Sequence, residues 1–185
     1  MLEYKRAAFF GRVFQDPAKG TCPTMTILEN MSLADNKGKA FNLRRGTNRQ
    51  RIDYYRESLR TLGLGLEDKM HVKVGVLSGG QRQAMALLMS TMTPIEFLIL
   101  DEHTAALDPK TAETIMELTH KIVKEKELTT IMVTHNLRYA VEYGDRLLMM
   151  HQGNVVIDRE GDEKQAMDID DILKKFNEIS IECGN

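Results

Sequence analysis

The chain has 185 residues, with 27 Asp and Glu against 25 Lys and Arg, so its formal net charge is −2. This near-neutral balance argues against nucleic acid as a partner, because phosphate backbones are held by a surplus of basic side chains. Hydrophobic residues make up 42% of the chain and charged residues 28%, as in one globular domain rather than a disordered chain. No apolar run is long enough to span a bilayer, and Cys22 and Cys183 lack zinc-site or disulfide spacing. The expected compartment is therefore the cytoplasm.

The first half of the chain is predicted to be mostly helical. Residues 19–46 are rich in turn-forming residues and indicate a loop followed by a helix. Apolar residues at three- and four-residue steps predict a helix over 49–62, which Gly63 and Gly65 end. A second helix is predicted over 81–92, a segment rich in Ala, Leu and Met that contains no Gly or Pro.

The second half alternates predicted strands and helices. An unbroken apolar run at 97–100 and a second buried-type segment at 129–134 predict parallel strands that are covered on both faces. Between them, Pro109 opens a helix and Asp108 is its expected N-cap. The elements expected after these are a helix at 137–143, paired strands at 147–150 and 155–157, and an amphipathic helix at 163–179. This order predicts an α/β fold with a parallel sheet.

A possible anion site lies directly before the predicted helix 81–92. Ser78, Gly79, Gly80 and Gln81 would offer a hydroxyl, accessible backbone N–H groups and the positive end of a helix dipole, which suit a phosphate. The alternative interpretation is an ordinary capped helix after a tight turn. The segment alone does not decide between the two.

Two consecutive carboxylates, Asp101 and Glu102, end the predicted strand 97–100. Parallel α/β folds place ligands at this edge of the sheet. Asp101 could hold Mg²⁺ and Glu102 could take a proton from an attacking water, as nucleotide hydrolysis requires. An acidic surface loop is the alternative.

Two further polar residues are placed at predicted strand ends. Gln15, in a Phe-Gln-Asp-Pro segment, could reach a metal ion or a water, and His135 could donate a hydrogen bond to a phosphate oxygen. The other histidines are interpreted as structural or solvent-exposed.

The order and spacing of these segments resemble those of the ATP-binding cassette (ABC) ATPases, over about residues 12–157. Gln15, Leu77 to Gln81, Asp101 with Glu102, Ala106 to Asp108, and Thr134 with His135 resemble the Q-loop, signature motif, Walker B strand, D-loop and H-loop. The resemblance implies a parallel-sheet, P-loop NTPase-like core with an inserted helical subdomain. The implied divisions are 1–18 (Q-loop region), 19–93 (helical subdomain and signature motif), 94–160 (core with Walker B, D-loop and H-loop) and 161–185 (C-terminal helix).

The resemblance also implies roles, with ATP and Mg²⁺ as cofactors. Asp101 and Gln15 would contact the metal, Glu102 would act as the general base and His135 would contact the γ-phosphate. The residues that would bind ATP held by a second subunit in a head-to-tail dimer are Ser78, Gly79, Gly80, Gln81 and Asp108. Further implied partners are integral-membrane permease subunits and a solute-binding protein, with the chain peripheral to the inner face of the cell membrane.

One part of the family pattern, the phosphate loop or Walker A motif, is absent from the sequence. The only Gly-Lys pair, Gly38-Lys39, is followed by Ala40, and Leu33 stands where the first glycine of the motif belongs. The resemblance therefore predicts a fragment that lacks the N-terminal Walker A lobe and hydrolyses ATP negligibly by itself, whereas the full-length parent is an ATPase.

The segments Arg-Val-Phe-Gln-Asp-Pro at 12–17 and Asp-Glu-His-Thr-Ala-Ala-Leu-Asp-Pro at 101–109 resemble those of bacterial importers of the tryptophan or tyrosine type. His103 stands where many relatives have Pro or Ala. The predicted function is an ATP-binding subunit that couples ATP hydrolysis to solute transport, with import expected. The alternatives are a soluble ABC ATPase outside transport and a non-catalytic remnant that binds or regulates.

Overall fold

The computed structural model describes residues 7–39 and 46–182, and the side chains up to residue 178. The chain divides into two compact units, one ending at Val133 and the other beginning at Thr134. The first unit contains β1 (Phe10–Val13), α2 (Ile27–Asp35), α3 (Ile52–Arg60), α4 (Gly79–Ser90), β2 (Phe97–Asp101), α5 (Pro109–Glu125) and β3 (Thr129–Val133), with short 3-10 helices at Pro17–Lys19, Arg49–Arg51 and Val74–Val76. The second contains α6 (Leu137–Glu142), β4 (Arg146–His151), β5 (Asn154–Glu160), α7 (Gly161–Gln165) and α8 (Ile169–Glu182).

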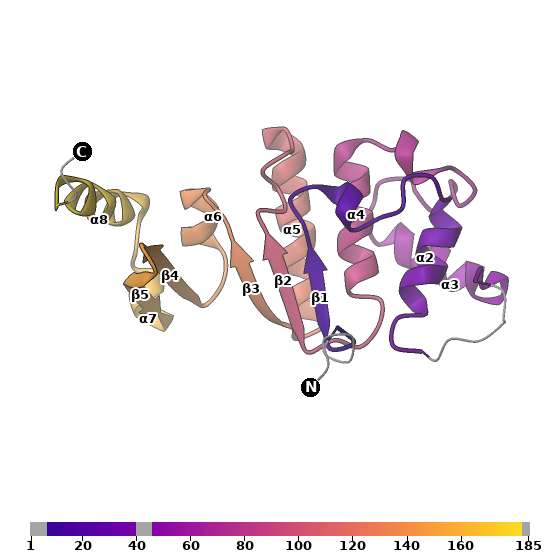
Figure 1. Cartoon of the computed structure of the whole chain (residues 1–185), viewed down its shortest axis with the longest axis horizontal. Coiled ribbons are helices and arrows are strands. Elements are labelled where there is room, and N and C mark those ends of the chain that lie inside the picture. The colour runs from indigo at the N-terminus through magenta and orange to yellow at the C-terminus, as the bar shows by residue number, and fades with distance from the viewer. Residues whose placement is uncertain (1–6, 40–45, 183–185) are drawn as a thin grey trace. The chain divides into compact units, whose positions relative to one another are not determined.

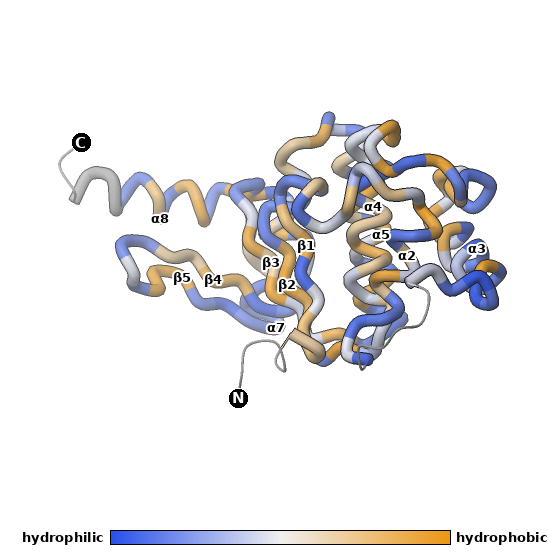
Figure 2. The backbone as a smooth tube through the Cα atoms, turned by 45° about the vertical axis from the view of Figure 1, so that its right-hand side comes forward, coloured by the Kyte–Doolittle hydropathy of each residue, from blue (hydrophilic) through white to orange (hydrophobic). Residues whose placement is uncertain are grey.

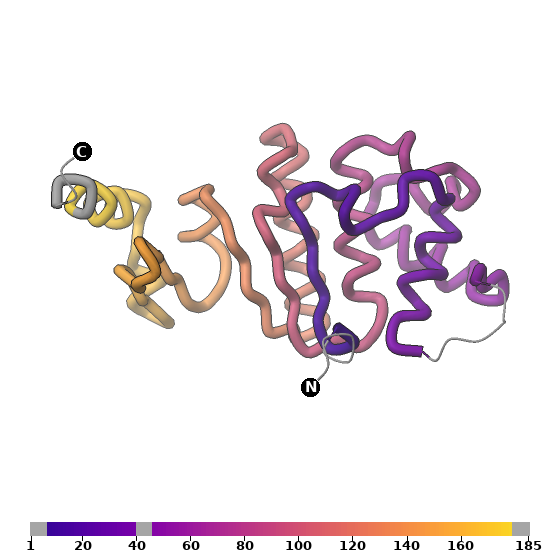
Figure 3. The backbone as a smooth tube through the Cα atoms, viewed as in Figure 1, coloured from indigo at the N-terminus to yellow at the C-terminus, as the bar shows by residue number. Residues whose placement is uncertain are grey.

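The first unit is built on a parallel sheet in the order β1-β2-β3, which confirms the predicted α/β fold (Figure 1). β1, from the beginning of the chain, lies beside β2, which follows the helical segments (Figure 3). Val13, Leu98 and Leu100 point to one face of the sheet and are buried there against α4 and α5. This core fixes the carboxyl ends of β1 and β2 side by side.

The other face of the sheet differs from the prediction that these strands are covered on both sides. Ile131 and Val133 on β3 are 58% and 50% exposed, and Phe10 and Phe97 stack on each other with ring centroids 5.4 Å apart while staying partly exposed. The strands are nevertheless apolar along most of their length (Figure 2). The physical reason is that α4 and α5 pack on the same face of the sheet.

A second core lies among α2, α3, α4 and the segment between α3 and α4. Its fully buried side chains include Met31 on α2, Tyr55 and Leu59 on α3, and Met85 on α4, with Met70 from the connecting segment. Met31, Met70 and Met85 are therefore core residues of this part of the chain. Flexible thioether side chains suit such an irregular interior.

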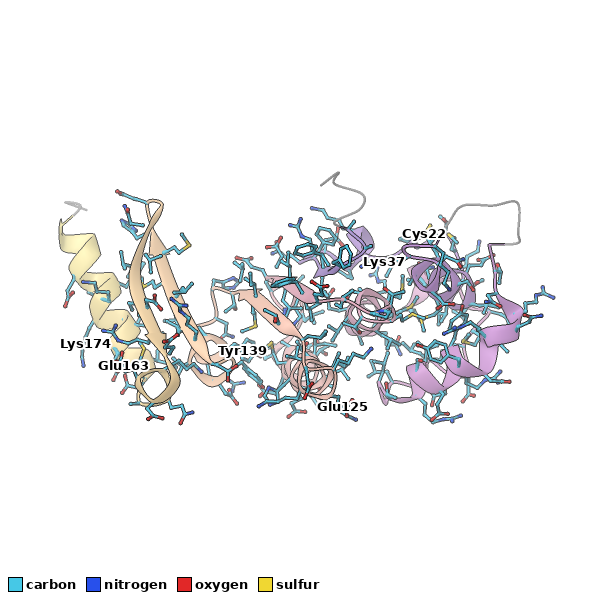
Figure 4. All side chains as sticks on the ribbon, turned by 90° about the horizontal axis from the view of Figure 1, so that it is seen from below. Cys22, Lys37, Glu125, Tyr139, Glu163 and Lys174 are labelled. Atoms are coloured by element: carbon cyan, nitrogen blue, oxygen red, sulfur yellow. The ribbon has the colours of Figure 1, made fainter. Side chains whose placement is uncertain are left out.

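A buried carboxylate joins α2 to α3. The hydroxyl of Tyr55 donates a hydrogen bond to Oδ2 of Asp35 at 2.9 Å, and Nε of Arg51 lies 3.1 Å from the same oxygen. Burial, together with this hydrogen bond, raises the pKa of Tyr55 to about 12. Lys37, which is labelled in Figure 4, lies just beyond α2. Its Nζ donates a hydrogen bond to the carbonyl oxygen of Phe10 on β1, and this bond ties the helical part to the sheet.

The second unit is a two-stranded antiparallel hairpin with helices. The predicted pairing of the two strands is confirmed, and Gln152 and Gly153 between them have φ values of 47° and 81°, as a two-residue hairpin turn requires. The single helix predicted at 163–179 is wrong in one respect, because the chain forms α7 and α8 with a break between them. The break arises where Asp168 accepts a hydrogen bond from the backbone N–H of Asp171 at 2.9 Å and so begins a new helix.

None of the helices in the described part of the chain is both long and apolar enough to cross a membrane.

Candidate functional site

The segment Ser78 to Gln81 begins α4 with a capping box. The Oγ of Ser78 accepts a hydrogen bond from the backbone N–H of Gln81 at 3.2 Å, and Oε1 of Gln81 accepts one from the N–H of Ser78 at 3.2 Å. Nε2 of Gln81 also donates to the carbonyl oxygen of Leu64 at 3.4 Å. The capped-helix interpretation is therefore correct, and it leaves an exposed Ser78 at the positive end of the α4 dipole.

Gly80 packs directly against the first turn of α5. A Cβ atom built on Gly80 would lie 2.3 Å from Cγ2 of Thr111, a distance that real Cβ atoms do not reach, whereas one on Gly79 would make an ordinary 3.5 Å contact with Leu107. Asp108 caps α5 by accepting a hydrogen bond from the N–H of Thr111 at 3.1 Å. Hydrogen bonds from Thr111 lower the pKa of the Asp108 carboxyl. The N-termini of α4 and α5 therefore lie side by side.

Asp101, at the end of β2, forms an ion pair with Arg12 of β1. Nη2 of Arg12 lies 2.8 Å from Oδ2 of Asp101, and the guanidinium group lies 4.5 Å from the centroid of the Phe14 ring. Both charged side chains are about half exposed, at 52% and 42%, so water screens the pair and it contributes little stability. The ion pair holds the Asp101 carboxylate beside Arg12, at the edge of the sheet where the strands end.

Glu102 follows β2 with a left-handed backbone, since its φ is 46°. This region is uncommon for residues other than glycine. The N–H of Glu102 donates to the carbonyl oxygen of Val133 at 2.9 Å, and its own carbonyl oxygen accepts from the N–H of Ala105 at 2.9 Å. The backbone that carries the predicted general base is therefore held from both sides, by β3 and by the turn that follows.

Gln15 and His135 were predicted at strand ends, and each lies two residues past the last residue of a strand, β1 and β3 respectively. Gln15 is exposed and follows β1, whose last residue, Val13, is the register partner of Leu100 on β2. The structure therefore places Gln15, Asp101 and Glu102 at the carboxyl edge of the same pair of strands. His135 is exposed and belongs to the second unit.

One carboxylate at this edge, that of Asp101, is of the kind that Mg²⁺ takes as a ligand. Within residues 7–39 and 46–182, no three His, Cys, Asp or Glu side chains gather into a metal site. Mg²⁺ commonly takes one or two carboxylates and completes its shell with water and phosphate oxygens. The Asp101 carboxylate can supply such a ligand.

Comparisons with known proteins identify the family of this chain. The family model described as "ABC transporter" matches residues 5–105. The chain is also 51% identical over 176 residues to a "Tyrosine transport ATP-binding protein" of Clostridioides difficile (strain R20291), which covers 95% of this chain and 70% of that protein. The chain belongs to the ABC transporter ATP-binding proteins. The predicted family is thereby confirmed.

Solved ABC proteins share the fold of this ABC chain. The dimeric ATP-binding cassette MJ0796, in a post-hydrolysis state bound to ADP and Pi, matches with a TM-score of 0.67 at 30% identity, over 85% of this chain and 65% of that one. The protein cbiO1 from Clostridium perfringens, part of the ABC transporter complex cbiONQ, matches with a TM-score of 0.69 at 26% identity, over 92% and 63%. The chain thus spans slightly less than two thirds of either structure.

Three residues that support the motifs of this ABC protein were missed by the sequence reasoning. Arg12 pairs with Asp101, Thr111 packs on Gly80, and the fully buried Gln83 donates from Nε2 to the carbonyl oxygen of Phe14 at 3.0 Å. Gln83 thereby links α4 to the segment that contains Gln15. The available signal for Gln83 was a polar residue within the predicted helix 81–92, which is rich in Ala, Leu and Met.

Proposed function

We propose that this chain is the ATP-binding part of a bacterial importer for tyrosine or a chemically similar aromatic amino acid. The observation that carries this proposal is the 51% identity to the Clostridioides difficile tyrosine transport ATP-binding protein, sustained over 95% of the chain. The site geometry supports the nucleotide half of the proposal, because Asp101 and Glu102 end a parallel strand at the edge where α/β folds bind ligands.

The proposed roles follow the position of each group. Asp101 would provide a magnesium ligand, with Gln15 near the same ion, and Glu102 would accept the proton of the attacking water. His135 would donate a hydrogen bond to the γ-phosphate of ATP. A bound Mg²⁺ would neutralise charge that develops on the phosphate oxygens.

The signature segment and the D-loop would serve a second nucleotide. Two helix N-termini lie side by side here, and each directs partial positive charge to the surface, which supports binding of a phosphate held by another subunit. In the proposed head-to-tail dimer, Ser78, Gly79, Gly80 and Gln81 contact that phosphate and Asp108 crosses the interface. MJ0796, which shares the fold, is described as dimeric.

The proposed complex also contains permease subunits and a solute-binding protein, and it places this chain at the cytoplasmic face of the membrane. Residues 19–93 would dock on the permease and residues 94–160 would carry the nucleotide chemistry, with 1–18 as the Q-loop region and 161–185 as a helical end. Membership of cbiO1 in the complex cbiONQ supports an assembly of this general kind.

Deletion of the gene tests the transport assignment. Uptake of radiolabelled tyrosine into the cells is expected to fall to background and to recover when the gene is supplied on a plasmid, because no other subunit would energise this importer. Uptake of radiolabelled leucine is the control and is expected to stay constant. Unchanged tyrosine uptake in the deletion strain would overturn the proposal and favour an ABC ATPase outside transport or a regulatory remnant.

We also expect the 185-residue chain by itself to bind Mg-ATP weakly and to release no measurable phosphate. The sequence contains no Gly-x4-Gly-Lys followed by Ser or Thr, the pattern whose backbone N–H groups wrap the phosphates. Calorimetric titration with Mg-ATP and a phosphate-release assay provide the measurements, and MJ0796, solved with ADP and Pi, is the positive control. Sustained turnover by the purified chain contradicts this expectation.

A further inference from the structure

His103 follows the proposed general base and is one of the most deeply buried polar residues of the first unit, with 2% of its surface exposed. Its Nε2 lies 3.2 Å from Oγ1 of Thr119, which is itself buried in the middle of α5. A side chain in this position connects the loop that carries Glu102 to a long helix behind it.

The direction of this hydrogen bond follows from the other bond that Thr119 makes. Oγ1 of Thr119 donates to the carbonyl oxygen of Ile115 at 2.7 Å, and a hydroxyl group has only one hydrogen. The ring of His103 must therefore donate, so Nε2 carries the proton. Burial also lowers the pKa of His103, to about 4, which is consistent with a neutral ring.

The backbone directly before His103 has an uncommon conformation. Glu102 adopts a φ of 46°, a conformation that persists in proteins only where the surroundings enforce it. Two backbone hydrogen bonds flank it, from Glu102 N–H to Val133 and from Ala105 N–H to Glu102. The next residue, His103, carries a buried ring that lies within hydrogen-bond distance of Thr119 on α5.

We infer that His103 is a positioning residue that acts through its hydrogen bond to Thr119 to hold the Glu102 backbone in the left-handed conformation. The inference rests on the proposed function only where it treats Glu102 as the general base. The hydrogen bond, the burial and the backbone geometry belong to the chain itself.

Amide hydrogen exchange of the 185-residue chain tests the inference without any nucleotide. Thr119→Val removes the hydroxyl group at nearly constant volume, and His103→Leu removes the donor. Both are expected to raise exchange at the Glu102 and Ala105 amides by about tenfold, the scale of a lost buried hydrogen bond. The matched controls keep the polar atoms: Thr119→Ser retains the acceptor and His103→Gln offers an Nε2 donor, and both are expected to stay within about twofold of wild type.

The Leu128 amide, which bonds to the carbonyl oxygen of Val123, reports on general loosening of the fold. Unchanged exchange at Glu102 and Ala105 in Thr119→Val and His103→Leu overturns the inference, and so does an equal rise at Leu128. In a transporter whose ATP-binding subunit carries both this segment and a Walker A motif, Thr119→Val is expected to lower maximal ATP turnover about tenfold with little change in KM. If exchange responds while turnover does not, the positioning holds and the role proposed for Glu102 is wrong.

Discussion

In a transporter whose ATP-binding subunit carries both this segment and a Walker A motif, replacing Glu102 with glutamine is expected to lower ATP turnover by roughly 10²- to 10⁴-fold. Glutamine has nearly the same shape as glutamate, but its amide oxygen cannot accept the proton of an attacking water. Glu102 lies at the strand end, and hydrogen bonds with Val133 and Ala105 hold its backbone. The substitution therefore removes the proton acceptor and leaves the backbone in place. Phosphate release from membrane vesicles that contain the transporter provides the measurement, with the KM for ATP expected to be nearly constant.

The matched control is Glu117→Gln, which makes the same change of charge on the exposed surface of α5. Its turnover is expected to stay within about twofold of wild type, as for most surface substitutions. If Glu102→Gln retains more than about a tenth of the wild-type rate, a different group accepts the proton. A rise in KM with unchanged maximal rate would instead assign Glu102 to nucleotide binding.

Substitution of Gly80 by alanine is expected to destabilise the chain by about 1–3 kcal/mol, as overpacking of a well-packed interior does. The new Cβ atom would lie 2.3 Å from Cγ2 of Thr111, so α4 and α5 would have to separate or Thr111 would have to leave its rotamer. The higher helix propensity of alanine offsets at most about 1 kcal/mol of this cost. Urea unfolding followed by far-UV circular dichroism provides the measurement.

Two further variants separate the clash from other effects of the added methyl group. Gly79→Ala adds a methyl group one residue earlier, where its 3.5 Å contact with Leu107 is ordinary, and is expected to cost less than about 0.5 kcal/mol. Combining Gly80→Ala with Thr111→Ser removes the colliding methyl group and is expected to recover most of the lost stability. If the double variant is as unstable as Gly80→Ala alone, the contact between Gly80 and Thr111 is not the cause.

Local signals in the sequence predicted most helix and strand ends. Asp108 and Pro109 begin α5 as expected, and Gly63 and Gly65 adopt the positive φ values, 66° and 65°, that end a helix. The break between α7 and α8 was missed because the apolar spacing continues across it, although Asp168 is an ordinary N-cap residue. The exposure of one sheet face could not be predicted, because an apolar run does not indicate on which side of the sheet the helices pack.

Only part of the candidate site could be predicted, again because local sequence patterns do not show how elements pack. Gln15, Asp101 and Glu102 are brought together by strand ends, and strand ends can be found from hydropathy. The residues that hold them come from elsewhere in the chain: Arg12 depends on the register of β1 with β2, and Thr119 lies in the middle of α5. Contacts between residues far apart in the sequence depend on how the helices and strands pack, and a local sequence pattern does not show this.

Oxidation of the buried methionines can show how often the core of the helical part opens to solvent. Met31, Met70 and Met85 are at most 3% exposed, whereas Met150 in the second unit is 64% exposed. Peroxide converts a thioether to a polar sulfoxide that an apolar interior does not accommodate, so it modifies a core methionine mainly while the core is open. The ratio of sulfoxide at the buried positions to that at Met150 therefore measures how often this core opens to solvent.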